Sequence, residues 1–204
     1  MAAPPQLQSR NSNGLDQFCA PLAEHPGLAI LDLAGANQNT ISFVTNFGHR
    51  LYSDDLLRQL DRCFGPAGAS AEEFYERQTE AHRVEEFLNS TLHFSDGSFD
   101  GALVWDTLQY LAPALLNTVV ARLRRMLRPG ASLLALFYAE ERPGMVPSCS
   151  YRISDHRTIL MTAREERRPA QYFNNRHLEK MFQEFASVKF FLTRDNLREV
   201  IVKR

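Results

Sequence analysis

The sequence predicts an α/β protein with one doubly wound, mostly parallel sheet of seven strands and an antiparallel pair of strands at its C-terminal edge. Short apolar runs, typical of strands buried on both faces, alternate with segments of helical spacing over most of the 204 residues. The last two apolar runs have no helix between them, and such strands pair antiparallel. The length suits one domain of ordinary size.

The expected elements follow one another along the chain. Strands are expected at residues 28–33, 49–53, 85–89, 99–105, 132–138, 188–193 and 199–203. Helices are expected at residues 39–47, 55–63, 71–84, 113–127 and 175–185, and residues 15–23 fit either a short helix or a loop. The clearest helix is 113–127, because its leucines and valines fall on one face and Arg128-Pro129-Gly130 ends it. Residues 139–171 are polar and irregular.

Composition and termini limit the class of protein. Residues 1–14 are rich in Pro, Ser, Asn and Gln and are expected to be a flexible tail before a single domain, 15–204. With 44% hydrophobic and 23% charged residues and a net charge of -1, the chain is globular and has no overall basic field for nucleic acid. The first residues show no signal pattern, and no apolar run reaches the roughly 20 residues that span a bilayer. We therefore expect a cytoplasmic protein that does not bind a membrane.

Metal-binding patterns are missing from the sequence. The three cysteines, Cys19, Cys63 and Cys149, form no CxxC pair, and the six histidines show no ligand spacing. Isolated cysteines of this kind are usually small buried apolar residues. We expect neither a disulfide framework nor a metal site.

Candidate binding residues stand directly after the strands, because ligands of such sheets bind beyond the carboxyl ends. These residues are Asp32, Ala34, Gly35, Ala36 and Asn37 after the first strand, Asp54 and Asp55 after the second, Asn89 after the third, and Trp105, Asp106 and Thr107 after the fourth. Asp54 lies 22 residues beyond Asp32, near the ~20 residues expected of a carboxylate that binds a ribose. Asp54 or Asp55 could instead only cap the following helix.

Four segments together resemble the class I S-adenosylmethionine-dependent methyltransferases. They are LAILDLAGANQNT, HRLYSDDL, LHFSDGSFDGALVWDTLQYL and LRRMLRPGASLLALFY, and they cover roughly residues 28–138. The closing helix and strand pair, 174–204, has the order in which that family ends. A nicotinamide-dependent dehydrogenase is the nearest rival, but no GxGxxG follows the first strand.

The resemblance implies a role for each matching residue. Asp32 would orient the glycine-rich loop, Ala34–Asn37 would be that loop, and Asp54 would bind the ribose of S-adenosylmethionine. Asn89 would stand near the adenine, and Trp105 and Asp106 near the methionine part. The loop departs from the family in carrying only Gly35, and Asn89 stands where an acid is common.

No catalytic residue can be assigned, because transfer from a sulfonium mainly requires alignment of the acceptor. Asp106, Tyr110, Tyr138, Tyr151 and His156 are candidates for contact with an acceptor. The segment Arg164-Glu-Glu-Arg-Arg168 reads as a solvated face or lid, or as a grip on an anionic acceptor. No Asn-Pro-Pro-Tyr segment follows the fourth strand, which disfavours transfer to a nucleic-acid base.

Two functions therefore remain open. The first is a methyltransferase that uses S-adenosylmethionine on an unidentified small-molecule or protein acceptor. The alternative is a catalytically inactive scaffold of the same fold that binds a partner, for example through residues 139–171. The two differ at Ala34–Ala36, where an enzyme leaves a groove and a scaffold can fill it. The sequence does not indicate an oligomeric state.

Overall fold

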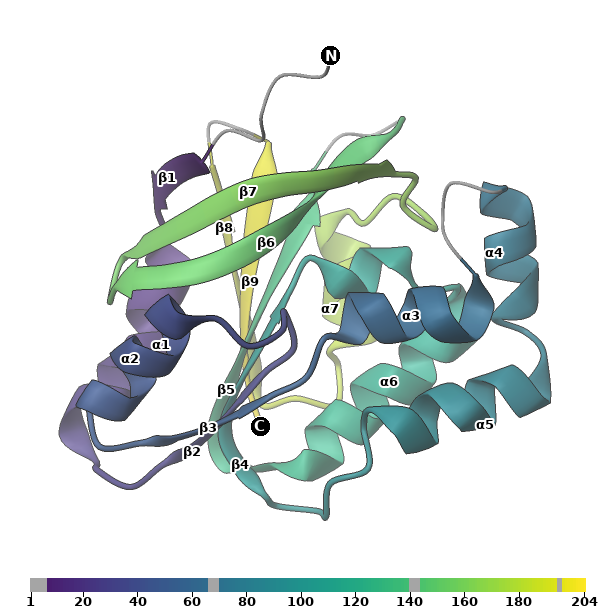
Figure 1. The fold of residues 1–204 in the computed structure, drawn as a ribbon. Coiled ribbons are helices and arrows are strands. Elements are labelled where there is room, and N and C mark those ends of the chain that lie inside the picture. The colour runs from purple at the N-terminus through teal and green to yellow at the C-terminus, as the bar shows by residue number, and fades with distance from the viewer. Residues whose placement is uncertain (1–6, 66–69, 140–143, 194–195) are drawn as a thin grey trace.

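A six-stranded, mostly parallel sheet forms the centre of the molecule (Figure 1). The computed structural model describes residues 7–65, 70–139, 144–193 and 196–204. The strand order is β3-β2-β4-β5-β9-β8, and β9 runs antiparallel to both of its neighbours. The strands are β2 Ala29–Asp32, β3 Arg50–Ser53, β4 Phe99–Trp105, β5 Leu127–Tyr138, β8 Ser187–Leu192 and β9 Leu197–Lys203.

Helices cover both faces of this sheet, as the sequence predicts for a doubly wound fold. Helices α1 and α2 lie on one face, and α3 to α7 lie on the other (Figure 1). Their bounds are α1 Asn13–Glu24, α2 Gln38–Asn46, α3 Leu56–Phe64, α4 Ala71–Arg77, α5 Ala81–Ser90, η1 Thr107–Tyr110, α6 Pro113–Met126 and α7 Asn175–Met181. Pro113 begins α6 at a position where its missing N–H costs nothing.

The expected seventh strand is wrong. Residues 85–89 belong to helix α5, so the main sheet has six strands among the described residues. Val84, Phe87 and Leu88 recur at helical spacing and pack against one hydrophobic core, which no alternating strand pattern would allow. The antiparallel pairing of the last two strands is confirmed.

A second, three-stranded antiparallel sheet replaces two regions expected to be irregular. Residues 139–171 contain the hairpin of β6, Val146–Asp155, and β7, Thr158–Arg167. Strand β1, Leu7–Asn11, pairs with β7 and lies in the segment 1–14 that was expected to be a flexible tail. Residues 1–6 lie outside the described residues. Figure 1 shows β6 and β7 crossing the upper end of the main sheet.

Alternating burial explains why this hairpin folds. Tyr151, Ile153, Ile159 and Met161 point inward and join one core cluster with Phe18 of α1, while the residues between them are more exposed. The polar outward residues hide this period of two in the sequence. The hairpin therefore covers the strand ends, which is where the candidate site lies.

Candidate functional site

The parallel register brings the predicted residues to one edge of the sheet. Asp32 pairs with Ser53 of β3 and with Leu103 of β4. The ends of β2, β3 and β4 therefore lie side by side, and Asp32, Asp54 and Trp105 share the carboxyl edge, as the sequence predicts.

The loop after β2 is tied to its surroundings by backbone hydrogen bonds. The Ala34 N–H donates to Asp32 Oδ1 over 3.1 Å, and the Gly35 N–H donates to the Asp54 carbonyl over 2.9 Å. Gly35 has φ +86°, a conformation that favours glycine. Asn37 caps α2 by accepting from the Thr40 N–H over 2.9 Å. Asp32 thus bonds to the first residue of the loop.

The two acids after β3 differ in their hydrogen bonds to the backbone of α3. Asp55 is the N-cap of α3, where Oδ1 accepts from the Arg58 N–H over 3.0 Å. Asp54 Oδ1 accepts from the Asp55 N–H over 2.8 Å, and its side chain is only partly buried. Asp54 is therefore not needed as a helix cap and remains available to a ligand.

A closed aromatic stack covers Asp32. The Trp105 indole N–H donates to Asp32 Oδ1 over 2.7 Å, and its ring lies parallel to the Tyr151 ring at 4.9 Å between centroids. All three side chains are buried, and Trp105 has φ +58°, an unusual backbone conformation for a bulky residue. Asp32 Oδ2 is buried and has no hydrogen-bond partner among the described residues. Burial raises the pKa of Asp32 to about 6, although the bonds from Trp105 and Ala34 oppose this shift.

A second buried carboxyl lies beside this stack. Asp106 Oδ2 accepts from the Cys149 N–H over 3.4 Å, and burial raises the pKa of Asp106 to about 7 despite the nearby Tyr151 hydroxyl. Burial also raises the pKa of the Cys149 thiol to about 12 and holds the phenol pKa values of Tyr110 and Tyr138 above their ordinary range. The phenols and the thiol are therefore neutral at physiological pH.

An open hollow of about 830 Å³ lies next to these closed groups. Its walls are the loop after β2, the end of β3, the exposed face of α3 and the hairpin. The lining residues are Ala34, Gly35, Ala36, Asn37, Ser53, Asp54, Asp55, Arg58, Gln59, Arg62, Ser150, Tyr151, Arg152 and Arg164. Of the predicted site residues, the hollow brings together Ala34, Gly35, Ala36 and Asp54.

Four predicted site residues lie outside the lining of this hollow. Asp32, Trp105 and Asp106 are buried under the hairpin, and Asn89 is exposed on α5. Asn89 does not lie at the carboxyl edge of the sheet, because residues 85–89, expected to be the third strand, belong to helix α5. His156 is exposed at the hairpin turn, 3.9 Å from Asp16, and does not reach the hollow.

Three arginines of the hollow were missed by the sequence reading: Arg58, Arg62 and Arg152. Arg58 and Arg62 are four residues apart on α3, and residues at this spacing share one face of a helix. That spacing is the one feature of the sequence from which their common position could have been predicted. Arg152 gives no signal until the hairpin is known. Arg164 lies in the segment 164–168, which the sequence predicts to be a solvated face or lid, or a grip on an anionic acceptor.

An ion pair fixes the hairpin over the site. The buried Arg167 guanidinium of β7 donates to Asp61 of α3 over 2.8 and 2.5 Å and also to Glu165. Its central carbon lies 5.9 Å from the centre of the Tyr110 ring. These contacts join the outer end of the hairpin to the helix that forms the opposite wall of the hollow.

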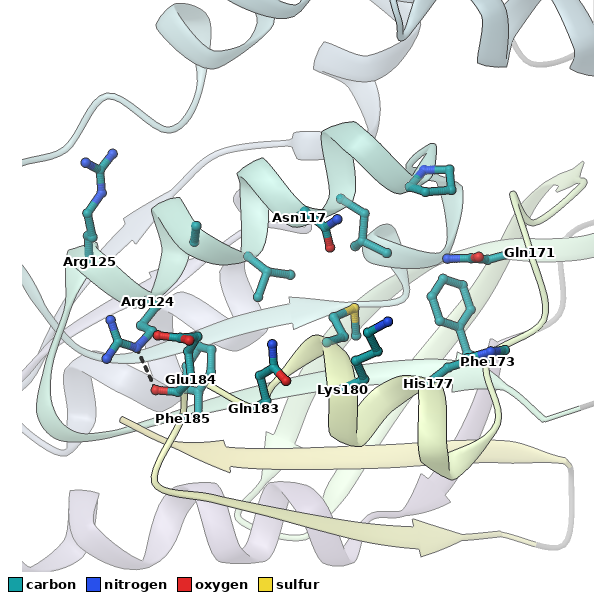
Figure 2. A pocket seen from close by; sticks show the side chains of 15 residues that line it. Asn117, Arg124, Arg125, Gln171, Phe173, His177, Lys180, Gln183, Glu184 and Phe185 are labelled. Carbon is teal, nitrogen blue, oxygen red and sulfur yellow. Dashed lines mark hydrogen bonds between the residues drawn. The ribbon is translucent and has the colours of Figure 1, made fainter.

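A separate hollow of about 610 Å³ lies between α6 and α7 (Figure 2). Its wall includes Arg124, Arg125 and Lys180, and Arg124 donates to the Glu184 carbonyl over 2.7 Å. It shares no lining residue with the hollow at the strand ends. No cluster of metal ligands is found in the described parts of the chain. No described helix combines the length and hydropathy needed to cross a membrane.

Solved structures identify the class of fold. The chain is 14% identical to the PH0226 protein of Pyrococcus horikoshii, with a TM-score of 0.50 over 92% of this chain and 88% of that one. It is 12% identical to phosphoethanolamine N-methyltransferase 2 of Haemonchus contortus, solved with phosphomonomethylethanolamine and S-adenosylhomocysteine. There the TM-score is 0.52 over 94% of this chain and 52% of that one. The fold is that of the class I S-adenosylmethionine-dependent methyltransferases, as the resemblance implied.

At these identities the likeness describes the fold alone. No protein-family profile matches the sequence, and no curated protein matches it. The chain spans about half the length of the Haemonchus enzyme, 52%.

Proposed function

We propose that this protein is an S-adenosylmethionine-dependent methyltransferase that holds the nucleoside part of its cofactor in the open hollow. The observation that carries the proposal is that the loop after β2 and the partly buried carboxylate of Asp54 line one hollow at the carboxyl edge of the sheet. A carboxylate there accepts hydrogen bonds from ribose hydroxyls, and the small residues Ala34–Ala36 leave room above the loop backbone. The solved Haemonchus enzyme with S-adenosylmethionine supports the choice of cofactor.

The residues present fit one half of the cofactor better than the other. Asp54 and the loop suit the ribose. Asp32 Oδ2, which lacks a donor among the described residues, suits an ammonium group. Trp105 and Tyr151 close the approach to that oxygen, so the methionine part requires their stack to shift. The bound cofactor would supply an activated methyl group for in-line displacement.

The chain's own contribution is to position the acceptor and exclude water. The hairpin covers Asp106, Tyr110 and Tyr138, and no nucleophile of the chain is needed. Asp106, with its pKa raised to about 7, can accept a proton from an acceptor that reaches it. The acceptor is a small molecule or a protein side chain.

One observation favours a second function, a scaffold of the same fold without activity. The buried Trp105–Tyr151 stack encloses the Asp32 carboxyl with the protein's own atoms. A scaffold would keep this stack permanently and use the hairpin surface for a partner.

Binding of S-adenosylhomocysteine separates the two functions. Calorimetric titration, together with a thermal-shift assay in case the heat is small, should detect binding to the wild type. Asp54→Asn should weaken that binding ten- to a hundredfold, because hydrogen bonds to a charged group contribute about 1.5–3 kcal/mol. Asp96→Asn, at an exposed turn near the opposite end of β4, is the matched control and should bind normally. No binding in either assay at millimolar ligand would reject the enzyme and support the scaffold.

A further inference from the structure

The hollow at the strand ends carries more positive than negative charge. Four arginines line it, Arg58 and Arg62 from α3 and Arg152 and Arg164 from the hairpin, against the two acids Asp54 and Asp55. The excess of two positive charges contrasts with the chain as a whole, whose net charge is -1. The basic character is therefore local, and the hollow between α6 and α7 shares it, with Arg124, Arg125 and Lys180 against Glu184.

Two of these arginines are not neutralised by the protein. Arg164 lies 3.6 Å from Asp55, and Arg62 lies 3.3 Å from Glu86 outside the hollow. The guanidinium groups of Arg58 and Arg152 have no ion-pair partner within the described ranges. Exposed arginines are often simply solvated. Here, however, Arg58 of α3 and Arg152 of the hairpin are far apart in the sequence and line the same hollow.

The start of helix α2 reinforces this charge. The loop that lines the hollow leads into α2, and Asp54 and Asp55 lead into α3, so both helices begin at its wall. Neither helix has an acidic residue in its first turn. The N-cap of α2 is the neutral Asn37, so the positive end of the α2 dipole adds to the arginine charge and favours an anion. At α3 the capping carboxylate of Asp55 offsets the dipole.

We propose that this hollow binds a phosphate monoester of a small molecule, with the phosphate between Arg58 and Arg152. The guanidinium groups of Arg58 and Arg152, which have no ion-pair partner among the described residues, can each bind phosphate oxygens through paired hydrogen bonds. S-adenosylmethionine does not compensate this charge, because its single carboxylate is outweighed by its cationic sulfonium and ammonium groups. That the phosphate belongs to the methyl acceptor rests on the function proposed above, whereas phosphate binding itself does not.

The test is calorimetric titration of the full chain with inorganic phosphate and with glycerol 3-phosphate, against chloride at equal ionic strength. Both phosphates should bind the wild type. The double variant Arg58→Gln, Arg152→Gln should bind them at least tenfold more weakly, because it loses both free guanidinium groups. The double variant Arg58→Lys, Arg152→Lys keeps the charge but loses the paired hydrogen bonds, so its affinity should lie between those of the wild type and of the glutamine variant. Such an intermediate affinity excludes misfolding as the cause.

The matched control removes two positive charges elsewhere. Arg125→Gln with Lys180→Gln alters exposed residues of the hollow between α6 and α7 (Figure 2) and should leave phosphate binding unchanged. Phosphate binding no tighter than chloride, or equal binding in all variants, would overturn the proposal and identify a screening effect only.

A parallel titration with S-adenosylhomocysteine keeps this result apart from the proposed function. Binding of S-adenosylhomocysteine without phosphate would leave the methyltransferase standing and remove the phosphorylated ligand. Phosphate binding without S-adenosylhomocysteine would support the anion site and remove its assignment to a methyl acceptor.

Discussion

The two halves of the surface at the strand ends are built in opposite ways. On one side Asp32, Trp105 and Tyr151 are closed under the hairpin, packed ring on ring and shielded from water. On the other side Asp54 and Arg58 border an open, polar hollow. The same edge of the same sheet is thus half hydrophobic core and half binding surface. A position at the carboxyl edge of the sheet therefore does not by itself mean that a ligand reaches it.

Trp105 is the residue on which the closed half depends most. Trp105→Ala removes a buried ring and its partner for Tyr151, and should lower the free energy of unfolding by about 3–5 kcal/mol. Urea denaturation with an unchanged m-value measures this loss. If the stack also blocks the methionine part of the cofactor, the folded variant should bind S-adenosylhomocysteine more tightly than the wild type.

Trp105→Phe is the conservative control. It keeps an aromatic ring beside Tyr151 but removes the hydrogen bond to Asp32, so it should cost about 1–3 kcal/mol. A loss below about 1 kcal/mol for Trp105→Ala would contradict a packed, closed half.

The fold was largely predictable because its strong signals are periodic. The apolar run of β2 and the one-sided apolar face of α6 each dictate one element, and the unbroken succession of β8 and β9 dictates their pairing. The prediction was wrong where signals are mixed. Residues 85–89 looked like a strand in a short window, although Val84, Phe87 and Leu88 already showed helical spacing.

The site was predictable only where local sequence decides it. The placement of Asp32, Asp54 and Trp105 at one edge follows from parallel strands alone. The closure by Tyr151 does not, because it depends on a hairpin that docks from more than forty residues further along the chain. Tertiary packing of that kind leaves no pattern near Trp105 itself.

The closed half should also show itself in the pH dependence of stability. The folded-state pKa values of Asp32 and Asp106, raised to about 6 and about 7, exceed the usual value near 4 of an unfolded chain. Between about pH 4 and about pH 6 to 7, Asp32 and Asp106 keep their protons in the folded protein, whereas the same groups have lost them in the unfolded chain. Stability is therefore highest below about pH 4 as far as these groups are concerned, and falls as pH rises through about 6 to 7.

Each group adds a slope of up to about 1.4 kcal/mol per pH unit within its window. Asp32→Asn and Asp106→Asn should each flatten the curve from urea denaturation at a series of pH values. Asp96→Asn, exposed and distant, should keep the wild-type slope. An unchanged slope in both buried variants would show that water reaches these carboxyls, and the contrast between the halves would weaken.

The smallest effect is expected in the loop of the open half. Gly35 has φ +86°, and a Cβ there would lie 3.2 Å from Asp55 Oδ2. Gly48 has φ +79° with nothing within 4 Å of its Cβ position, so Gly48→Ala carries only the backbone cost of about 1–2 kcal/mol. Gly35→Ala should lose that amount and up to about 1 kcal/mol more, from crowding of the Asp55 carboxylate. Denaturation midpoints of the two variants measure the difference. Equal losses would mean that Asp55 yields freely, and that this wall of the hollow is adaptable and not preformed.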